Sequence, residues 1–276
     1  MVILFNAIKI IIYQLCRAEI NYIKRMIDIY ALAKNPLVFQ KQRTITSAYI
    51  DVSGKMGLAQ TVLMVQDNIT ENFGAIKMDN FAVKEMGGFW VVSRAKFKFL
   101  KRPYWRDKVV TTSFPADNQL IRLNENTAIT TVEGEPIILA KQEMCCLSFD
   151  RHRPMRLSSV NFPTEGFPEA LMTSDFDRFN VKPEEYVEIY QQKVLPQHID
   201  MSHHMNNIEY VKLALNVFSA SDLELCIPAA LEIHYLGESK EGQIMRVFRA
   251  NHNGATYMRI LDETDRPVFE MKLRMM

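Results

Sequence analysis

Two short stretches of this 276-residue chain decide the fold: residues 50–56 read IDVSGKM, and residues 199–205 read IDMSHHM. They agree at Ile, Asp, Ser and Met in matching places. Each stretch follows a strand-like segment and precedes apolar residues at helical spacing. Because the two stretches share residues and occupy the same position between a strand and a helix, we interpret the chain as two copies of one unit. The first copy covers 36–150 and the second covers 185–276.

One long helix is predicted in each copy, directly after the repeated stretch. In the first copy its apolar face comprises Leu58, Val62, Val65, Ile69 and Phe73, and in the second, over about 206–219, it comprises Ile208, Val211, Leu215 and Phe218. Strands are predicted at 37–50, 89–99, 107–114, 119–132 and 136–150, and again at 186–195, 229–238, 243–250, 255–262 and 267–275. The plan is one antiparallel sheet wrapped around one long helix, made twice.

Two segments fall outside this plan. Residues 151–184 are rich in Pro, Arg, Asp and Ser and are predicted to be a linker. Residues 1–35 are predicted to be an N-terminal extension, and Lys9 interrupts the apolar run there, which is therefore too short to span a bilayer. Three interpretations stay open for the start of the chain: an extension upstream of Met26, a helix packed on the first copy, and a weak membrane-surface helix.

The overall composition is that of an ordinary globular protein. The chain has 33 Lys and Arg against 32 Asp and Glu, and 48% of its residues are hydrophobic. These values exclude a long disordered chain, a collagen-like chain and a strongly basic nucleic-acid-binding protein. Four cysteines make no disulfide framework, so we expect a reducing, cytoplasmic compartment.

The two copies differ where chemistry is expected. Residues 53–58 read SGKMGL, whereas residues 202–207 read SHHMNN. The second copy therefore places two imidazoles and two amides beside Asp200, at a junction between a strand and a helix. The unpaired N–H groups of a helix N-terminus can stabilise an oxyanion, so a hydrolytic site is one interpretation. The other is that Asp200, Ser202 and Asn206 only cap the helix and form the turn.

Several motifs resemble those of one enzyme family. Residues 199–210, IDMSHHMNNIEY, resemble the D-x-N-x-H-x-N-N-x-x-Y signature of the acyl-acyl carrier protein (acyl-ACP) thioesterases of plants and bacteria. YLGES at 235–239 resembles Y-x-x-E-C, and WVVSR at 90–94 and PYWRD at 103–107 resemble W-V-x-x-R and P-x-W-G-D. The resemblance covers about 36–276. It implies an α+β fold of two tandem hot-dog domains, each an antiparallel sheet wrapped around a long central helix.

The resemblance also implies an activity: hydrolysis of fatty acyl-ACP, which releases free fatty acid and ends chain elongation without a cofactor. The implied catalytic residues are Asp200, His204, Glu238, Ser202 and Asn206. Ser239 stands where the family has Cys, and Ser202 where it has Asn, so a Cys-His nucleophile cannot operate here. We therefore expect Glu238 to activate water, Asp200 to fix His204, and amides at the helix start to bind the oxyanion.

Substrate contacts are expected in the first copy, whose own site looks degenerate. Leu58, Val62 and Val65 are predicted to line the acyl-chain pocket. An acidic carrier protein would be attracted by a basic run, and the candidates are Lys96, Lys98, Lys101 and Arg102. A second run has Arg151, Arg153 and Arg156. The alternative is that these runs are only solvated faces.

Other functions stay open at this point. They are acyl-CoA hydrolysis, a non-catalytic tandem hot-dog protein that binds acyl chains or the carrier, and a dehydratase on the same fold. No metal site is expected, because His203 and His204 are sequence neighbours and no Cys or His pair has ligand spacing. The motifs of nucleotide-binding proteins, serine hydrolases and zinc proteases are absent from the sequence. Nucleic-acid binding and stable membrane insertion are not expected, and a homodimer is the assembly considered.

Overall fold

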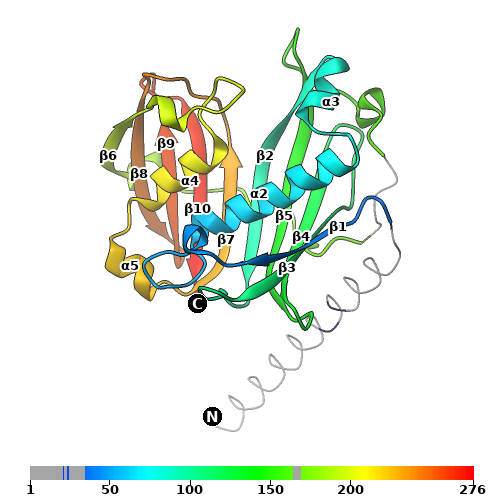
Figure 1. Cartoon of the computed structure of the whole chain (residues 1–276). Helices are drawn as coiled ribbons and strands as arrows, with labels where there is room; N and C mark the ends of the chain where they lie inside the picture. The colour runs from blue at the N-terminus through cyan, green and yellow to red at the C-terminus, as the bar shows by residue number, and fades with distance from the viewer. Residues whose placement is uncertain (1–20, 22–23, 25–34, 164–168) are drawn as a thin grey trace.

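The structure is a computed structural model that describes Asn21, Lys24 and residues 35–163 and 169–276. The described strands form one ten-stranded sheet in the order β1-β3-β4-β5-β2-β7-β10-β9-β8-β6. Every pairing in it is antiparallel. The first half of the chain therefore supplies one side of the sheet, and the second half supplies the other (Figure 1).

The elements repeat in the same order in the two halves. The first half contains β1 (Phe39–Thr44), α2 (Leu58–Ala75), α3 (Asn80–Glu85), β2 (Gly88–Phe99), β3 (Lys108–Pro115), β4 (Leu123–Thr131) and β5 (Pro136–Ser148). The second half contains β6 (Val187–Lys193), α4 (Asn207–Leu215), α5 (Ala220–Leu225), β7 (Pro228–Tyr235), β8 (Ile244–His252), β9 (Ala255–Leu261) and β10 (Pro267–Met275). Short 3-10 turns occur at Ser47–Tyr49, Leu157–Val160, Pro183–Glu185 and Pro196–His198.

Several predicted elements are shorter in the structure, and two of them bear on the site. The strand expected over 37–50 ends at Thr44 and gives way to a 3-10 turn. The helix expected over 206–219 ends at Leu215, so Phe218 lies outside it. The physical reason is a second helix start: Ser219 accepts a hydrogen bond from the Asp222 backbone N–H, and the Asp222 carboxylate accepts one from the Ser219 N–H, which caps α5.

The two halves are joined along β2 and β7, whose paired residues run from Arg94–His234 to Lys98–Ala230. Because this pairing continues the sheet without a break, α2 and α4 lie on the same face of it (Figure 1). Their apolar residues share one core with strand residues from both halves, such as Phe97 and Leu231. The sequence predicts that Phe89, Val91, Ala95, Phe97 and Phe99 share the buried face of this strand. The prediction is correct for Ala95, Phe97 and Phe99. It is wrong for Phe89 and Val91, because a β-bulge between Val92 and Arg94 reverses the alternation and buries Trp90 instead.

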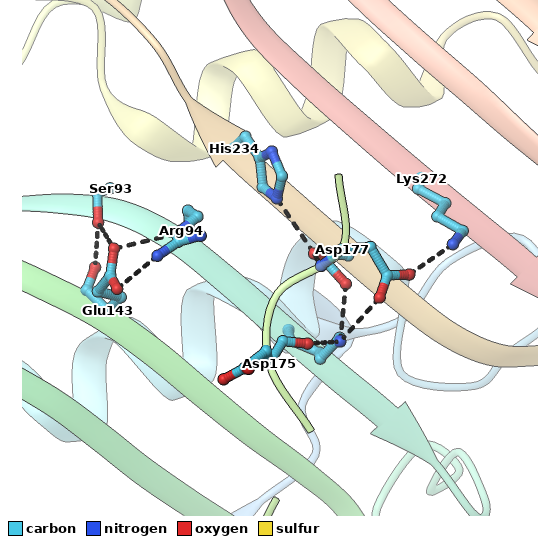
Figure 2. A network of polar contacts seen from close by, with 9 residues as sticks. Ser93, Arg94, Glu143, Asp175, Asp177, His234 and Lys272 are labelled. Carbon is cyan, nitrogen blue, oxygen red and sulfur yellow. Dashed lines mark hydrogen bonds and ion pairs between the residues drawn. The ribbon is translucent and has the colours of Figure 1, made fainter. Parts of the chain in front are cut away.

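Residues 175–179, here called the strap, cross the other face of the sheet at the β2–β7 junction (Figure 2). The backbone N–H of Asp177 donates to Glu232 at 2.5 Å, and the Asp177 carboxylate lies 2.6 Å from Lys272 Nζ. Phe179 stacks on His234, with ring centroids 4.2 Å apart. Lys96 completes the junction, because its Nζ lies 3.0 Å from Glu232 and donates to the Asp175 carbonyl at 2.6 Å.

The predictions for residues 1–35 fall almost entirely outside the described residues. Lys24, which is described, forms an ion pair with Glu135 at 2.7 Å. Among the described helices, none is both long and apolar enough to cross a membrane.

The junction generates a stability prediction. In Lys96→Met the buried Glu232 loses its lysine partner and keeps only its contacts with His234 and the Asp177 N–H. We expect this loss to lower the free energy of unfolding by about 3 kcal/mol. The matched control is Lys101→Met, at an exposed position near the end of the same strand, with an expected change below about 0.5 kcal/mol. Equal urea-unfolding curves for the two variants would show that Lys96 does not hold the junction.

Candidate functional site

The repeated stretch of the second half forms a tight loop between the 196–198 turn and α4. The Asp200 N–H donates to the His204 carbonyl at 2.9 Å, and the His203 N–H donates back to the Asp200 carbonyl at 3.0 Å. His203 has a left-handed backbone, with φ of 62°. The Asp200 carboxylate accepts hydrogen bonds from the Ser202 N–H, at 2.8 Å, and from the Ser202 hydroxyl. These bonds fix the loop and the direction in which His204 leaves it.

The loop is fastened to the segment that follows β7. The Met205 N–H donates to the Ser239 carbonyl at 2.8 Å. This contact brings together two predicted residues, since His204 Nε2 lies 3.2 Å from Glu238 Oε2. The imidazole is 26% exposed and the carboxylate 45% exposed, so both are reachable from solvent. An imidazole and a carboxylate in contact at an open position can bind and deprotonate a water molecule.

The N-terminus of α4 begins beside this pair. Asn206 caps the helix, because its Oδ1 accepts from the Ile208 N–H at 3.0 Å. The N–H group of Asn207, the first residue of α4, has no hydrogen-bond partner among the described residues. A helix N-terminus carries partial positive charge, so this donor suits a developing oxyanion. Asn206 thus has the capping role that its residue type indicates.

Asp200 does not have the predicted contact. We expected it to fix the His204 imidazole, but its carboxylate bonds to Ser202 instead. The physical reason is the turn itself: the Ser202 N–H and hydroxyl lie two residues on and saturate the nearer oxygen of the carboxylate. Asp200 and Ser202 therefore act on the loop backbone, and through it on the position of His204.

Sequence reasoning missed two residues that hold Glu238. Arg266 Nη2 donates to the Glu238 carbonyl at 3.3 Å, and Arg266 Nε donates to Asp262 at 2.9 Å. Burial opposes ionisation of Asp262, yet its hydrogen bonds from Thr264 and Arg266 prevail and lower its pKa to about 2. The sequence does indicate the turn at Asp262, because an Asp two residues before a Thr often accepts hydrogen bonds from that Thr and so forms a turn.

The site is backed by buried aromatic and hydroxyl groups. Tyr210 of α4 stacks on Phe269 at 5.7 Å, and burial raises the pKa of its phenol to about 12. Ser239, which stands where the family has Cys, is fully buried and its hydroxyl contacts the Met245 sulfur at 3.4 Å. A hydroxyl in this position is directed into the core and not toward the His204–Glu238 pair.

The first half builds the same scaffold with different side chains. Its Met56 N–H donates to the Pro103 carbonyl at 2.8 Å, just as Met205 bonds to Ser239. The residues before Pro103 also match. The N–H groups of Leu100 and Lys101 both donate to the Ile137 carbonyl. In the second half, the N–H groups of Leu236 and Gly237 both donate to the Val268 carbonyl. This correspondence puts Arg102 in the place of Glu238 and Lys55 in the place of His204.

Arg102 is consequently not a surface residue, and the prediction that it belongs to an exposed carrier-docking run is wrong. Only 6% of it is exposed, and its Nη1 lies 2.6 Å from the Asp51 carboxylate. It also donates to the Ser53 hydroxyl at 3.1 Å and to the Cys226 carbonyl at 3.2 Å. A guanidinium cannot accept a proton from water, so Arg102 cannot act as a base in the place that Glu238 occupies in the second half.

The other predicted docking residues are scattered. Lys96 faces outward as expected, but the strap covers it and it is engaged with Glu232. Lys98 is half-buried on the same outer face, and Lys101 is exposed. Lys101 lies just past the end of β2 that is farther from Glu238. Because β2 has 12 residues, this end is about 35 Å along the strand from the end on the side of Glu238.

The predicted acyl-chain residues all lie on the buried face of α2. Val62 and Val65 are completely buried in the main core. Leu58 lines a cavity of about 150 Å³ with Arg102 and Leu215, and a neighbouring cavity of about 230 Å³ lies between Lys55 and Ile227. Both cavities adjoin the degenerate site of the first half and not the His204–Glu238 pair. Within the described residues, no three His, Cys, Asp or Glu side chains gather as metal ligands would.

The buried Arg102–Asp51 pair generates a second stability prediction. Arg102→Leu leaves the Asp51 carboxylate unpaired, and we expect the free energy of unfolding to fall by about 3–5 kcal/mol. Adding Asp51→Asn to this variant removes the unpaired charge and should recover more than half of the loss. Chemical denaturation of the two variants measures both values, and no recovery in the double variant would contradict an ionic origin.

Residues 181–267 match the family described as the acyl-ACP thioesterase C-terminal domain. An acyl-ACP thioesterase from Bacteroides thetaiotaomicron superimposes with a TM-score of 0.77 at 15% identity, over 87% of this chain and 98% of that chain. The 12:0-ACP thioesterase from Umbellularia californica superimposes with a TM-score of 0.75 at 14% identity, over 86% and 96%. No curated protein matches the chain. The predicted tandem hot-dog fold is confirmed.

Proposed function

We propose, from the premise that residues 181–267 form an acyl-ACP thioesterase C-terminal domain, that this protein hydrolyses the thioester of fatty acyl-ACP and releases free fatty acid. The single observation that carries the proposal is the 3.2 Å contact between His204 and Glu238 beside the N-terminus of α4. We assign catalysis to the unit over 185–276 and acyl-chain binding to the unit over 36–150, with 151–184 as the linker between them.

The chemistry follows from the positions of these groups. Glu238 takes a proton from a water molecule while the water oxygen attacks the thioester carbonyl carbon. The tetrahedral oxyanion is stabilised at the start of α4, where the Asn207 N–H is unengaged. The C–S bond then breaks, and the carrier thiolate receives the proton. His204 holds the Glu238 carboxylate in place, and Asp200 and Ser202 hold the loop that presents His204.

The acyl chain, in this proposal, lies in the first unit along α2, on whose buried face Leu58, Val62 and Val65 lie. The carrier is recognised by charge. Arg151, Arg153 and Arg156 are exposed and follow β5, which ends at the same edge of the sheet as the strand leading to Glu238. This run replaces Lys96, Lys98, Lys101 and Arg102 as the proposed docking site, because it follows a strand that ends on the same side of the sheet as β7.

We further propose a reducing, cytoplasmic location, which the free thiols of Cys145, Cys146 and Cys226 support. A homodimer is the assembly to be tested by light scattering of the purified chain.

The central prediction concerns Glu238. Glu238→Gln keeps the size of the side chain but cannot take a proton, so kcat on acyl-ACP should fall by at least about 100-fold. The matched control is Ser239→Ala, which removes a hydroxyl that faces Met245 and should retain more than half of the activity. Release of carrier thiol measures both. Near-normal turnover in Glu238→Gln would remove this carboxylate from the mechanism, and loss of turnover in Ser239→Ala would point to a nucleophile at that position.

Carrier docking generates a separate prediction. Changing Arg151, Arg153 and Arg156 together to Glu should raise KM for acyl-ACP by about tenfold or more and leave KM for a small acyl thioester unchanged, because only the acidic carrier meets the run. Lys101→Glu, at the far edge of the sheet, is the control and should have little effect.

The same assay separates the remaining alternatives. Higher kcat/KM on acyl-CoA than on acyl-ACP would favour an acyl-CoA thioesterase. Binding of both carriers without hydrolysis would favour a non-catalytic acyl-binding or carrier-binding protein.

A further inference from the structure

A buried carboxyl group lies in the first half, far from the catalytic pair. Glu125 of β4 is 1% exposed, and neither of its carboxylate oxygens has a hydrogen-bond partner among the described residues. It is on the face of β4 that meets α2, since Leu123 and Ile129, which alternate with it, belong to the main core. Burial raises the pKa of Glu125 well above its usual range, which favours the neutral carboxylic acid.

The inner face around Glu125 is polar, which the other half does not share. Asn68 of α2 donates to the Ser113 hydroxyl at 2.7 Å, and Ser113 is hydrogen-bonded to Thr127 at 2.8 Å. Asn68 also accepts from the Thr111 hydroxyl at 2.5 Å. In the second half, the corresponding strand β9 presents Met258 and Ile260 to its core instead. An apolar chain alone gives no reason for this polar lining.

A second unpartnered group lies at the level of Glu125. Asn72, one helical turn after Asn68, donates to the Leu37 carbonyl at 3.3 Å, while its Oδ1 is buried without a partner. Phe39 of β1 is paired with Ser113 of β3, so Leu37, two residues earlier, lies opposite Pro115. Pro115 is in turn paired with Glu125 of β4. The strand pairing therefore puts Glu125 and the Leu37 carbonyl, to which Asn72 is bonded, at the same level of the sheet under α2, two strands apart.

Leaving such groups unpaired is costly. Natural proteins rarely tolerate this cost without a use for the group. A hydroxyl group has the chemistry that the two residues lack, because it can accept from the Glu125 acid and donate to Asn72 Oδ1.

The strand pairing also says where such a hydroxyl would lie on the substrate. Glu125 is paired with Gln142, Gln142 with Ala95, and Ala95 with Ile233 of β7. Three strand spacings across the sheet and five residues along from Ile233 to Glu238 together span roughly 20 Å. An acyl chain whose thioester is at Glu238 would therefore reach Glu125 only with its distal part.

We infer that this protein prefers acyl chains that carry a hydroxyl group on their distal half, received by Glu125 and Asn72. The inference rests on the proposed thioesterase function. It adds a substrate class, the distally hydroxylated fatty acyl thioesters, and makes Glu125 a specificity-determining residue. The polar network of Asn68, Ser113 and Thr127 supports the helix above it.

The experiment compares acyl-ACP substrates of one chain length, with and without a terminal hydroxyl. The wild-type protein should favour the hydroxylated chain by at least about tenfold in kcat/KM, because a polar site left unfilled rejects the plain chain. Glu125→Leu should abolish the preference and turn over the plain chain at least as well as wild type. It should also raise Tm, since an unpaired buried carboxyl is lost. Glu143→Gln, which changes a buried carboxylate that is paired with Arg94 on the outer face, is the control and should keep the preference.

Two results would overturn the inference. The first is equal kcat/KM on the two substrates in the wild-type protein. The second is a lower Tm in Glu125→Leu with an unchanged substrate preference, since Glu125 would then be only a structural partner of Asn72. Binding of the free hydroxylated and plain fatty acids, measured by calorimetry, separates this inference from the proposed function. If the protein hydrolyses neither substrate but binds the hydroxylated acid more tightly in a way that depends on Glu125, only the thioesterase function is refuted. Hydrolysis without any such preference would refute the inference alone.

Discussion

The antiparallel pairing of β2 with β7 is the contact on which the rest of the molecule depends. It runs from Arg94–His234 to Lys98–Ala230 and makes one continuous sheet from the two halves. Because the strands are antiparallel, the loop after β7 and the loop after β2 lie at opposite edges of the sheet. Glu238 and Arg102, which follow these strands, are therefore placed far apart, and each meets the helix start of its own half.

The two helix starts share a backbone and differ in charge. In each, a main-chain bond from a Met joins the loop to the residue that follows the key side chain. On this common frame, a carboxylate beside an imidazole forms an open acid–base pair, whereas a guanidinium beside a carboxylate forms a closed ion pair. In the proposed function only the first of these pairs is reactive. The second links the two halves, because Arg102 donates to the Cys226 carbonyl of the second half.

Much of the fold could be predicted from the sequence, because apolar periodicity and the repeat at 50–56 and 199–205 depend only on local spacing. The proximity of His204 and Glu238 depends on two segments far apart in the chain, and only the family resemblance indicated it. Local pattern was misleading for Arg102, which stands in an apparently exposed basic run. Alternation placed Lys96 on the correct face, but no local pattern could show that residues from the linker cover that face.

In the proposed mechanism the nucleophile is a water molecule that Glu238 activates, and not the Glu238 carboxylate itself. The most direct test is a single turnover of acyl-ACP in ¹⁸O-labelled water, with the protein in excess and the fatty acid analysed by mass spectrometry. One labelled oxygen in the product of the first turnover is the result that this mechanism predicts. Unlabelled fatty acid from that turnover would contradict it, because the oxygen would then have come from a carboxylate of the protein.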